Sequence, residues 1–96
     1  MLRDLWDRLL GPPLPKYTLE EIAVHNSEGN EVWLVAHGKI FNAKPILEEG
    51  HPGGDQSILR RARACADATQ DYDFHSKSAR RKWEQHIVGV VTRKKK

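Results

Sequence analysis

Two histidines of the chain have a local sequence that suits them to bind a metal. His51 opens the motif His51-Pro52-Gly53-Gly54, and His75 stands at the end of an acidic, aromatic segment further along. Pro52 biases the preceding histidine toward an extended backbone, and the two glycines can adopt positive φ angles, so the chain can turn tightly here. Imidazoles at opposite ends of one folded pocket can bind the same metal ion. His51 and His75 are therefore a natural pair of ligands for a single metal, although for Pro-Gly-Gly on its own an ordinary loop is the better interpretation.

The stretch from Leu47 to His75 resembles the haem-binding region of the cytochrome b5 family, whose signature is His-Pro-Gly-Gly followed further along by His-Ser. Similarity to that family begins at Tyr17 and ends at about Val91. The resemblance implies one haem b (iron protoporphyrin IX) per chain with His51 and His75 as axial ligands, bound noncovalently because no Cys-x-x-Cys-His motif is present. It also implies these haem-binding residues: Ile46, Leu47, Pro52, Gly53, Gly54, Ile58, Tyr72, Phe74 and, near a haem propionate, Ser76. The five aliphatic and aromatic residues among them are also compatible with an ordinary core.

An iron with two imidazole ligands has both axial positions filled, so it changes oxidation state with little rearrangement. The resemblance therefore implies an electron carrier rather than an enzyme, or the redox module of a larger oxidoreductase. It would receive electrons from a flavin-dependent reductase and pass them to an unidentified acceptor protein. The alternatives are a haem sensor or delivery module, and a non-haem metal-binding interaction domain. Zinc is less favoured, because structural zinc usually has four ligands, often cysteines, and the chain has one Cys.

The resemblance and the hydrophobic pattern together predict an α+β fold, in which a small mixed sheet and short helices form the haem pocket. Thr18 and Glu21 have the spacing of a capping box, which predicts a helix that ends near Asn26. A tight turn is expected at residues 37–39. The other expected elements are strands at residues 32–36, 40–42 and 87–91, and helices at residues 45–49, 55–66 and 78–85.

Apolar residues recur at helical spacing between residues 2 and 10, which predicts an amphipathic helix. The chain then divides into this helix with a proline-rich connector (1–16), a cytochrome b5-like domain (17–91) and a basic tail (92–96). The helix at residues 2–10 is expected to pack on its own domain, on a partner protein or on a membrane surface. No apolar run approaches the ~20 residues that cross a bilayer, so no transmembrane segment is predicted.

The composition limits the class of protein further. A chain of 96 residues suits one domain, and the single Cys65 excludes an internal disulfide and fits a reducing compartment. We therefore expect a cytoplasmic monomer. The net charge is +3, but acidic and basic residues are interleaved outside the tail, so nucleic-acid binding is not predicted.

Carboxylates near the two histidines predict a locally acidic docking rim for a basic partner protein. They are Glu48, Glu49, Asp55, Asp67, Asp71 and Asp73. Arginines interrupt this series and are expected on the outer side of the helix at residues 55–66: Arg60, Arg61 and Arg63. The expected molecule is therefore bipolar, with its acidic side around the haem.

Overall fold

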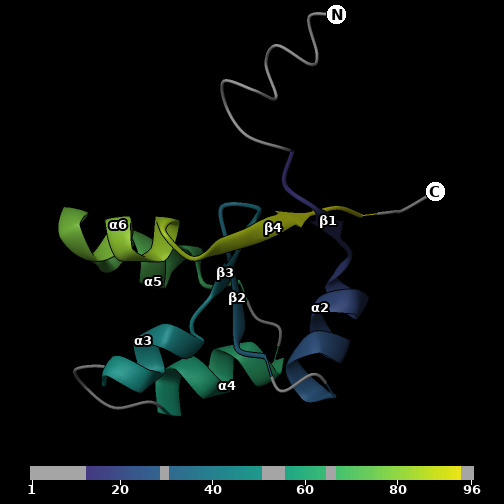
Figure 1. Cartoon of the computed structure of the whole chain (residues 1–96), viewed down its shortest axis with the longest axis horizontal. Coiled ribbons are helices and arrows are strands. Elements are labelled where there is room, and N and C mark those ends of the chain that lie inside the picture. Colours follow the sequence, from purple (N-terminus) through teal and green to yellow (C-terminus); the bar gives the residue numbers. More distant parts are fainter. Residues whose placement is uncertain (1–12, 29–30, 51–55, 65–66, 94–96) are drawn as a thin grey trace, which may run out of the picture.

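A computed structural model of the chain describes residues 13–28, 31–50, 56–64 and 67–93. The fold is α+β, as predicted, with a four-stranded mixed sheet in the order β1-β4-β3-β2 (Figure 1). β1 pairs in parallel with β4, whereas the β4–β3 and β3–β2 pairs are antiparallel. The elements are β1 (Lys16–Tyr17), α2 (Leu19–Ser27), β2 (Trp33–Ala36), β3 (Lys39–Asn42), α3 (Lys44–Glu49), α4 (Gln56–Ala64), α5 (Thr69–Phe74), α6 (Lys77–Glu84) and β4 (Ile87–Val91). Several predictions concern residues outside the described ones: the helix at residues 2–10, Cys65, and the segment 51–55 with His51, Pro52, Gly53 and Gly54.

The sheet has a buried cluster on each face, because successive residues of a strand point to opposite sides. On one face, Trp33 and Val35 of β2 pack with Ile22 of α2 and Ile40 of β3. The cluster on the other face consists of Leu34, Ala36, Phe41, Ala43, Ile58, Ala62, Ala68 and Trp83. All four residues of β2 are therefore buried, as its continuous apolar run predicts.

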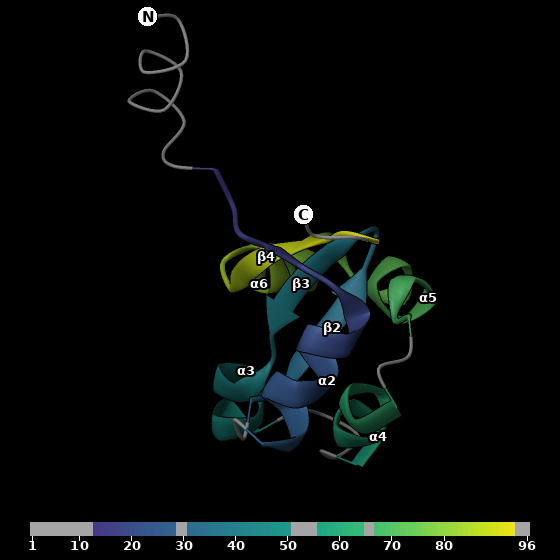
Figure 2. The same cartoon turned by 90° about the vertical axis from the view of Figure 1, so that its right-hand side faces the viewer.

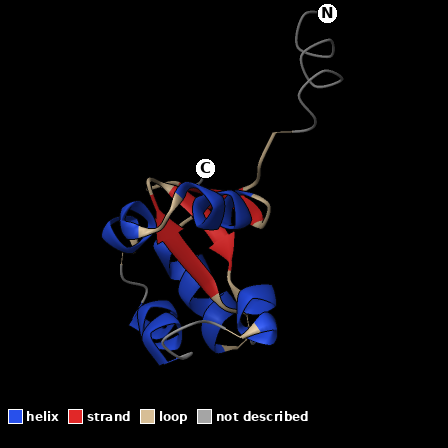
Figure 3. Cartoon of the chain, turned by 90° about the vertical axis from the view of Figure 1, so that its left-hand side faces the viewer, coloured by secondary structure: helices blue, strands red, loops and turns tan. Residues whose placement is uncertain are grey.

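The helices cover the two faces unequally. Figure 2 shows α2 in front of β2, on the side of the Trp33 cluster. The other helices lie on the opposite side in two groups, α3 with α4 and α5 with α6, and the strands are visible between the groups in Figure 3. Ile58 of α4 and Trp83 of α6 belong to the same buried cluster, so this part of the core is shared by both groups. None of the described helices combines the length and the apolar composition needed to cross a membrane.

Side-chain caps explain where two of the helices begin. Thr18 Oγ1 accepts a hydrogen bond from the Glu21 N–H at 3.2 Å, and the Glu21 carboxylate accepts one from the Thr18 N–H at 2.9 Å, so the predicted capping box is confirmed. Ser76 Oγ accepts a hydrogen bond from the Ala79 N–H at 3.3 Å and caps α6 in the same way. The structure also contains two elements that the sequence did not predict. They are the two-residue strand β1 and the helix α5, whose N-cap residue, Ala68, makes no side-chain capping bond.

The turn between β2 and β3 consists of His37 and Gly38, both with positive φ angles of 51° and 72°. A two-residue loop of this kind has the twist of the strands that it joins. A positive φ is uncommon for a residue with a side chain, and contacts with α5 hold His37 in place. Its N–H donates to Thr69 Oγ1 at 2.9 Å, and its Nε2 lies 2.7 Å from Asp73 Oδ1. The predicted turn is therefore present, and it is anchored to the helix that leads to His75.

The outer edge of β2 is closed by a side chain and a loop. The Trp33 N–H donates to Asn26 Oδ1 at 2.8 Å, and Asn26 Nδ2 donates to the Trp33 carbonyl at 3.1 Å. Two residues further along, the Val35 carbonyl accepts a hydrogen bond from the Ala68 N–H at 2.6 Å. Unpaired strand edges can pair with other chains, so these bonds protect β2 and fix α2 and the start of α5 against it.

Gly89 of β4 is expected to tolerate no larger residue. A Cβ at this position would lie 2.7 Å from the Pro15 carbonyl oxygen and 2.9 Å from Cε2 of Tyr17. That carbonyl accepts a hydrogen bond from the Val90 N–H at 2.9 Å, so it cannot move without disturbing the β1–β4 pair. Gly89→Ala is therefore expected to lower the free energy of unfolding by about 1–3 kcal/mol, measured by urea unfolding. Gly38→Ala is the control, because a Cβ added there meets no atom within 4 Å. This variant is expected to lose only the ~1 kcal/mol that a positive φ costs a residue with a side chain. Parent-like stability of Gly89→Ala would contradict the prediction.

Candidate functional site

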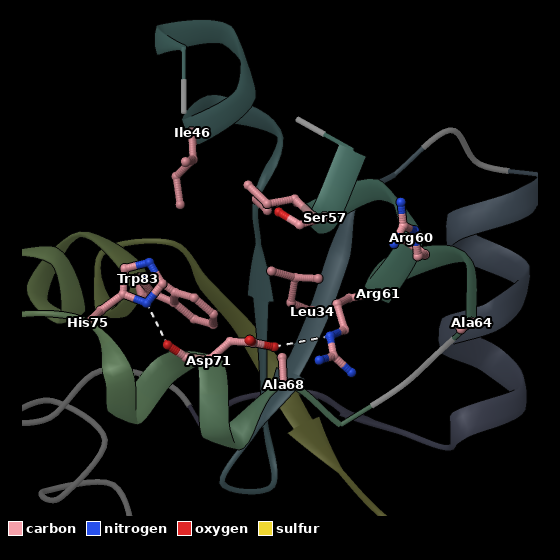
Figure 4. A pocket seen from close by; sticks show the side chains of 12 residues that line it. Leu34, Ile46, Ser57, Arg60, Arg61, Ala64, Ala68, Asp71, His75 and Trp83 are labelled. Atoms are coloured by element: carbon pink, nitrogen blue, oxygen red, sulfur yellow. Dashed lines mark hydrogen bonds and ion pairs between the residues drawn. The ribbon is translucent and has the colours of Figure 1, made fainter. Parts of the chain in front are cut away.

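Two adjoining cavities lie on the side of the sheet that carries α3 to α6. Their volumes are about 500 Å³ and about 550 Å³, within the ~300–1,000 Å³ typical of ligand pockets. Ile46, His75 and Trp83 line both cavities, which therefore meet at these side chains. The apolar lining of the first cavity also includes Leu34, Ala43, Ile58, Ala64 and Ala68. Its polar lining includes Ser57, Arg60, Arg61 and Asp71 (Figure 4).

His75 lies between α5 and α6, and its ring is held from two sides. α5 ends at Phe74 because His75 has an extended backbone, with φ −72° and ψ 154°, and Ser76 then caps α6. Nδ1 of His75 donates a hydrogen bond to the Asp71 carbonyl, and the ring packs edge-on against Trp83 at a centroid distance of 5.5 Å (Figure 4). A proton on Nδ1 places the lone pair of the neutral ring on Nε2, the nitrogen that can donate to a metal. The ring is thus oriented as metal-binding imidazoles are.

A packed aromatic group supports His75 from behind. Trp83 is 7% exposed, and its ring lies edge-on to Phe41 at 5.4 Å and to Tyr72 at 5.3 Å. The Tyr72 hydroxyl donates to Glu84 Oε1 at 2.9 Å. This hydrogen bond, with burial and the negative charge of Glu84, raises the pKa of the Tyr72 hydroxyl, which stays a neutral donor at physiological pH. The group therefore limits how far the His75 ring can turn.

Three of the residues predicted to line a haem border the cavities. Ile46 lines both of them, Ile58 lines the first and Phe74 lines the second. Ile58 is buried, whereas the Phe74 side chain is 91% exposed. An apolar ring this exposed beside a cavity is a candidate contact for an apolar ligand.

The other predicted lining residues lie elsewhere or are outside the described part of the chain. Leu47 and Tyr72 pack against the Leu34 cluster and are not among the residues that line these two cavities. Ser76 caps α6 and is exposed. The described residues do not include the second predicted ligand and its motif: His51, Pro52, Gly53 and Gly54.

Two arginines of α4 are exposed, as predicted for the outer side of the helix, and they also line the first cavity, which was not predicted. Arg60 and Arg61 both border the cavity, and Arg61 Nε forms an ion pair with Asp71 Oδ2 at 3.1 Å (Figure 4). The helical spacing of Ser57, Arg61 and Ala64 could have indicated this position, since residues three and four apart share one face.

Some carboxylates of the predicted acidic rim have basic partners in the described part of the chain. Arg61 pairs with Asp71 at 3.1 Å and Lys82 pairs with Glu49 at 3.8 Å, while His37 Nε2 lies 2.7 Å from Asp73 Oδ1. Each of these side chains is between 44% and 66% exposed, so each pair contributes little to stability. Their main effect is to reduce the negative charge that was predicted for this face.

The other described histidines have different environments. His25 stacks on Trp33 at a centroid distance of 4.1 Å, on the α2 face of the sheet. His37 lies in the β2–β3 turn, and His86 directly precedes β4. None of the three lines either cavity. Among the described histidines, His75 is thus the candidate metal ligand.

The residues of the two cavities fit a haem. Apolar side chains such as Leu34, Ile46 and Trp83 can cover a flat macrocycle, and the oriented imidazole of His75 is a suitable iron ligand. The segment with the second predicted ligand follows α3 and precedes α4 in the sequence, and both helices contribute residues to the wall of the first cavity.

Comparisons with known proteins agree with this fit. Residues 18–92 match the family model of the "Cytochrome b5-like Heme/Steroid binding domain". Cytochrome b5 isoform B of Arabidopsis thaliana is 38% identical over 84 residues, which are 85% of this chain and 60% of that protein. NADH nitrate reductase of Volvox carteri is 42% identical over 81 residues, which are 83% of this chain and 9% of that protein. This chain thus spans only part of either relative.

The fold has close counterparts among solved structures. Cytochrome b558 of Ectothiorhodospira vacuolata, described as a prokaryotic homologue of cytochrome b5, superposes with a TM-score of 0.61 at 28% identity. The match covers 80% of this chain and 98% of that one. The family binds haem b and transfers electrons, and its domain also occurs in nitrate reductase. Sequence, fold and cavity agree, and this chain belongs to the cytochrome b5-like haem-binding family.

Proposed function

We propose that this domain is a one-electron carrier that holds one haem b between His75 and His51. The observation that carries the proposal is the oriented ring of His75 at the boundary of two cavities. The chemistry that a bound haem supplies is a reversible one-electron change at iron. His75 and His51 would hold the haem iron, and two imidazole ligands would favour electron transfer over the binding of oxygen.

The residues of the chain orient the ligand and limit the access of water. The hydrogen bond from Nδ1 of His75 to the Asp71 carbonyl fixes the tautomer and the direction of the ring. Leu34, Ile58 and Trp83 give the first cavity an apolar wall, which helps to set the potential of a bound metal. We also assign the ring of Phe74 to the haem contacts, because this apolar ring is exposed and lines the second cavity.

The proposed electron donor is a flavin-dependent reductase, and the acceptor is a second protein. The match to a nitrate reductase supports a place in an oxidoreductase system, because there the similar segment is 9% of an oxidoreductase. The domain would act either as a separate carrier or as the redox module of a longer chain. The ion-paired rim favours a docking face of mixed charge over the acidic one that the sequence suggested.

Titration of the purified protein with haem b tests the proposal. We expect saturation at one haem per chain and the absorption spectrum of six-coordinate, low-spin iron in the oxidised and reduced forms. A spectrum that remains that of free haem would refute the proposal. A five-coordinate, high-spin spectrum would leave one axial position open and would favour haem sensing or delivery instead.

A further inference from the structure

The α4 wall of the first cavity is cationic, whereas the other described elements that line it contribute mostly apolar residues. Among the described residues, the lining of this cavity contains the two guanidinium groups of Arg60 and Arg61 and one carboxylate, that of Asp71. The second cavity has one ammonium group and one carboxylate, those of Lys82 and Glu49, which pair at 3.8 Å. The excess positive charge of the combined site therefore lies at α4.

The ion pair with Asp71 does not use all the donors of Arg61. A guanidinium group has five N–H donors, and Arg61 meets Asp71 Oδ2 through Nε at 3.1 Å. The donors on its terminal nitrogens can therefore bind a second anion. Arg60 has no carboxylate within ion-pair distance in the described part of the chain, and the hydroxyl of Ser57 lies on the same wall.

We propose that Arg60 and Arg61 bind the propionate carboxylates of the haem, so that the propionate edge faces α4. Haem b has an apolar macrocycle with two carboxylates on one edge, which matches a cavity with apolar walls and one cationic wall. Guanidinium groups bind carboxylates through paired, charge-assisted hydrogen bonds. The inference rests on the proposed haem-binding function and adds to it the direction in which the haem lies.

A purely structural role for Arg61 has to be separated from this binding role. The Arg61–Asp71 pair joins α4 to α5, so loss of Arg61 could also shift the helix that leads to His75. Haem b dimethyl ester separates the two roles, because its esterified propionates carry no charge while its macrocycle and iron are unchanged. A shifted helix weakens the binding of both compounds, whereas a lost carboxylate contact weakens only that of haem b.

The experiment measures the dissociation constants of haem b and of its dimethyl ester by spectral titration. The double variant Arg60→Gln, Arg61→Gln is expected to lose about tenfold or more in affinity for haem b, as the loss of a charge-assisted contact predicts, with unchanged affinity for the ester. Asp71→Asn breaks the ion pair but keeps Arg61, so haem b is expected to bind it at least as tightly as the parent. Arg63→Gln is the matched control on α4, since Arg63 is exposed and does not line the cavity.

The outcomes distinguish this inference from the proposed function. If the double variant loses equal affinity for haem b and for the ester, the Arg61–Asp71 pair only positions α5. The same conclusion follows if Asp71→Asn loses as much affinity for haem b as the double variant does. No loss in the double variant would place the propionates elsewhere. Either result overturns the inference and leaves haem binding intact. If the parent binds neither compound, the proposed function fails and the inference fails with it.

Discussion

Replacing His75 with alanine is expected to abolish the six-coordinate, low-spin spectrum of the haem-loaded protein. Among the described residues, His75 has the one imidazole that lines the cavities, and its ring is oriented by the Asp71 carbonyl and by Trp83. Changes to the groups that orient a metal ligand typically cost 10–100-fold in metal affinity, so loss of the ligand itself should weaken haem binding by about 100-fold or more. Absorption spectra and haem titration measure both effects.

Two histidines that do not line the cavities, His25 and His37, provide the controls for this variant. His25→Ala and His37→Ala are expected to keep the parent spectrum, because these residues lie on the α2 face and in the β2–β3 turn. His51→Ala is expected to behave like His75→Ala, since His51 is the second proposed ligand. A low-spin spectrum that survives in His75→Ala would require a different axial ligand.

Features that depend on neighbouring residues could be predicted from the sequence. The Thr18–Glu21 capping box spans one helical turn, and the β2–β3 turn depends on the conformational freedom of Gly38 beside His37. The apolar run that forms β2 indicated a strand buried on both faces. Resemblance to a family then indicated which histidines are the ligands. Composition and periodicity alone would not have distinguished them from the other histidines.

Features that depend on distant partners could not be predicted in the same way. β1 has two residues and exists because the chain there pairs with β4. Arg61 lies near Asp71 because α4 and α5 are adjacent in space, and helical spacing alone does not say which face meets a cavity. The ion pairs of Asp71 and Glu49 in the predicted acidic rim were missed for the same reason, since their basic partners come from other elements.

Asn26 is another residue whose role depends on distant partners, because its side chain joins three elements. Its Nδ2 donates to the Trp33 carbonyl at 3.1 Å and to the Ala62 carbonyl at 2.9 Å, and its Oδ1 accepts from the Trp33 N–H at 2.8 Å. One amide thus ties the end of α2 to β2 and to α4. Ala62 is the neighbour of Arg61, so the anchor acts on the helix that forms the cationic wall of the cavity.

Asn26→Ala is therefore expected to lower the free energy of unfolding by about 2–3 kcal/mol, measured by urea unfolding. The substitution removes three hydrogen bonds and leaves backbone groups of Trp33 and Ala62 without these partners, although those residues are only 7% and 4% exposed. Ser27→Ala is the matched control, because the Ser27 hydroxyl is exposed and bonds to the Ala23 carbonyl of its own helix at 2.8 Å, so a change within about 0.5 kcal/mol is expected. Since α4 loses its anchor, haem b should also bind Asn26→Ala more weakly than Ser27→Ala. Equal stability of the two variants would show that water replaces the amide, and that α4 is held by its apolar contacts alone.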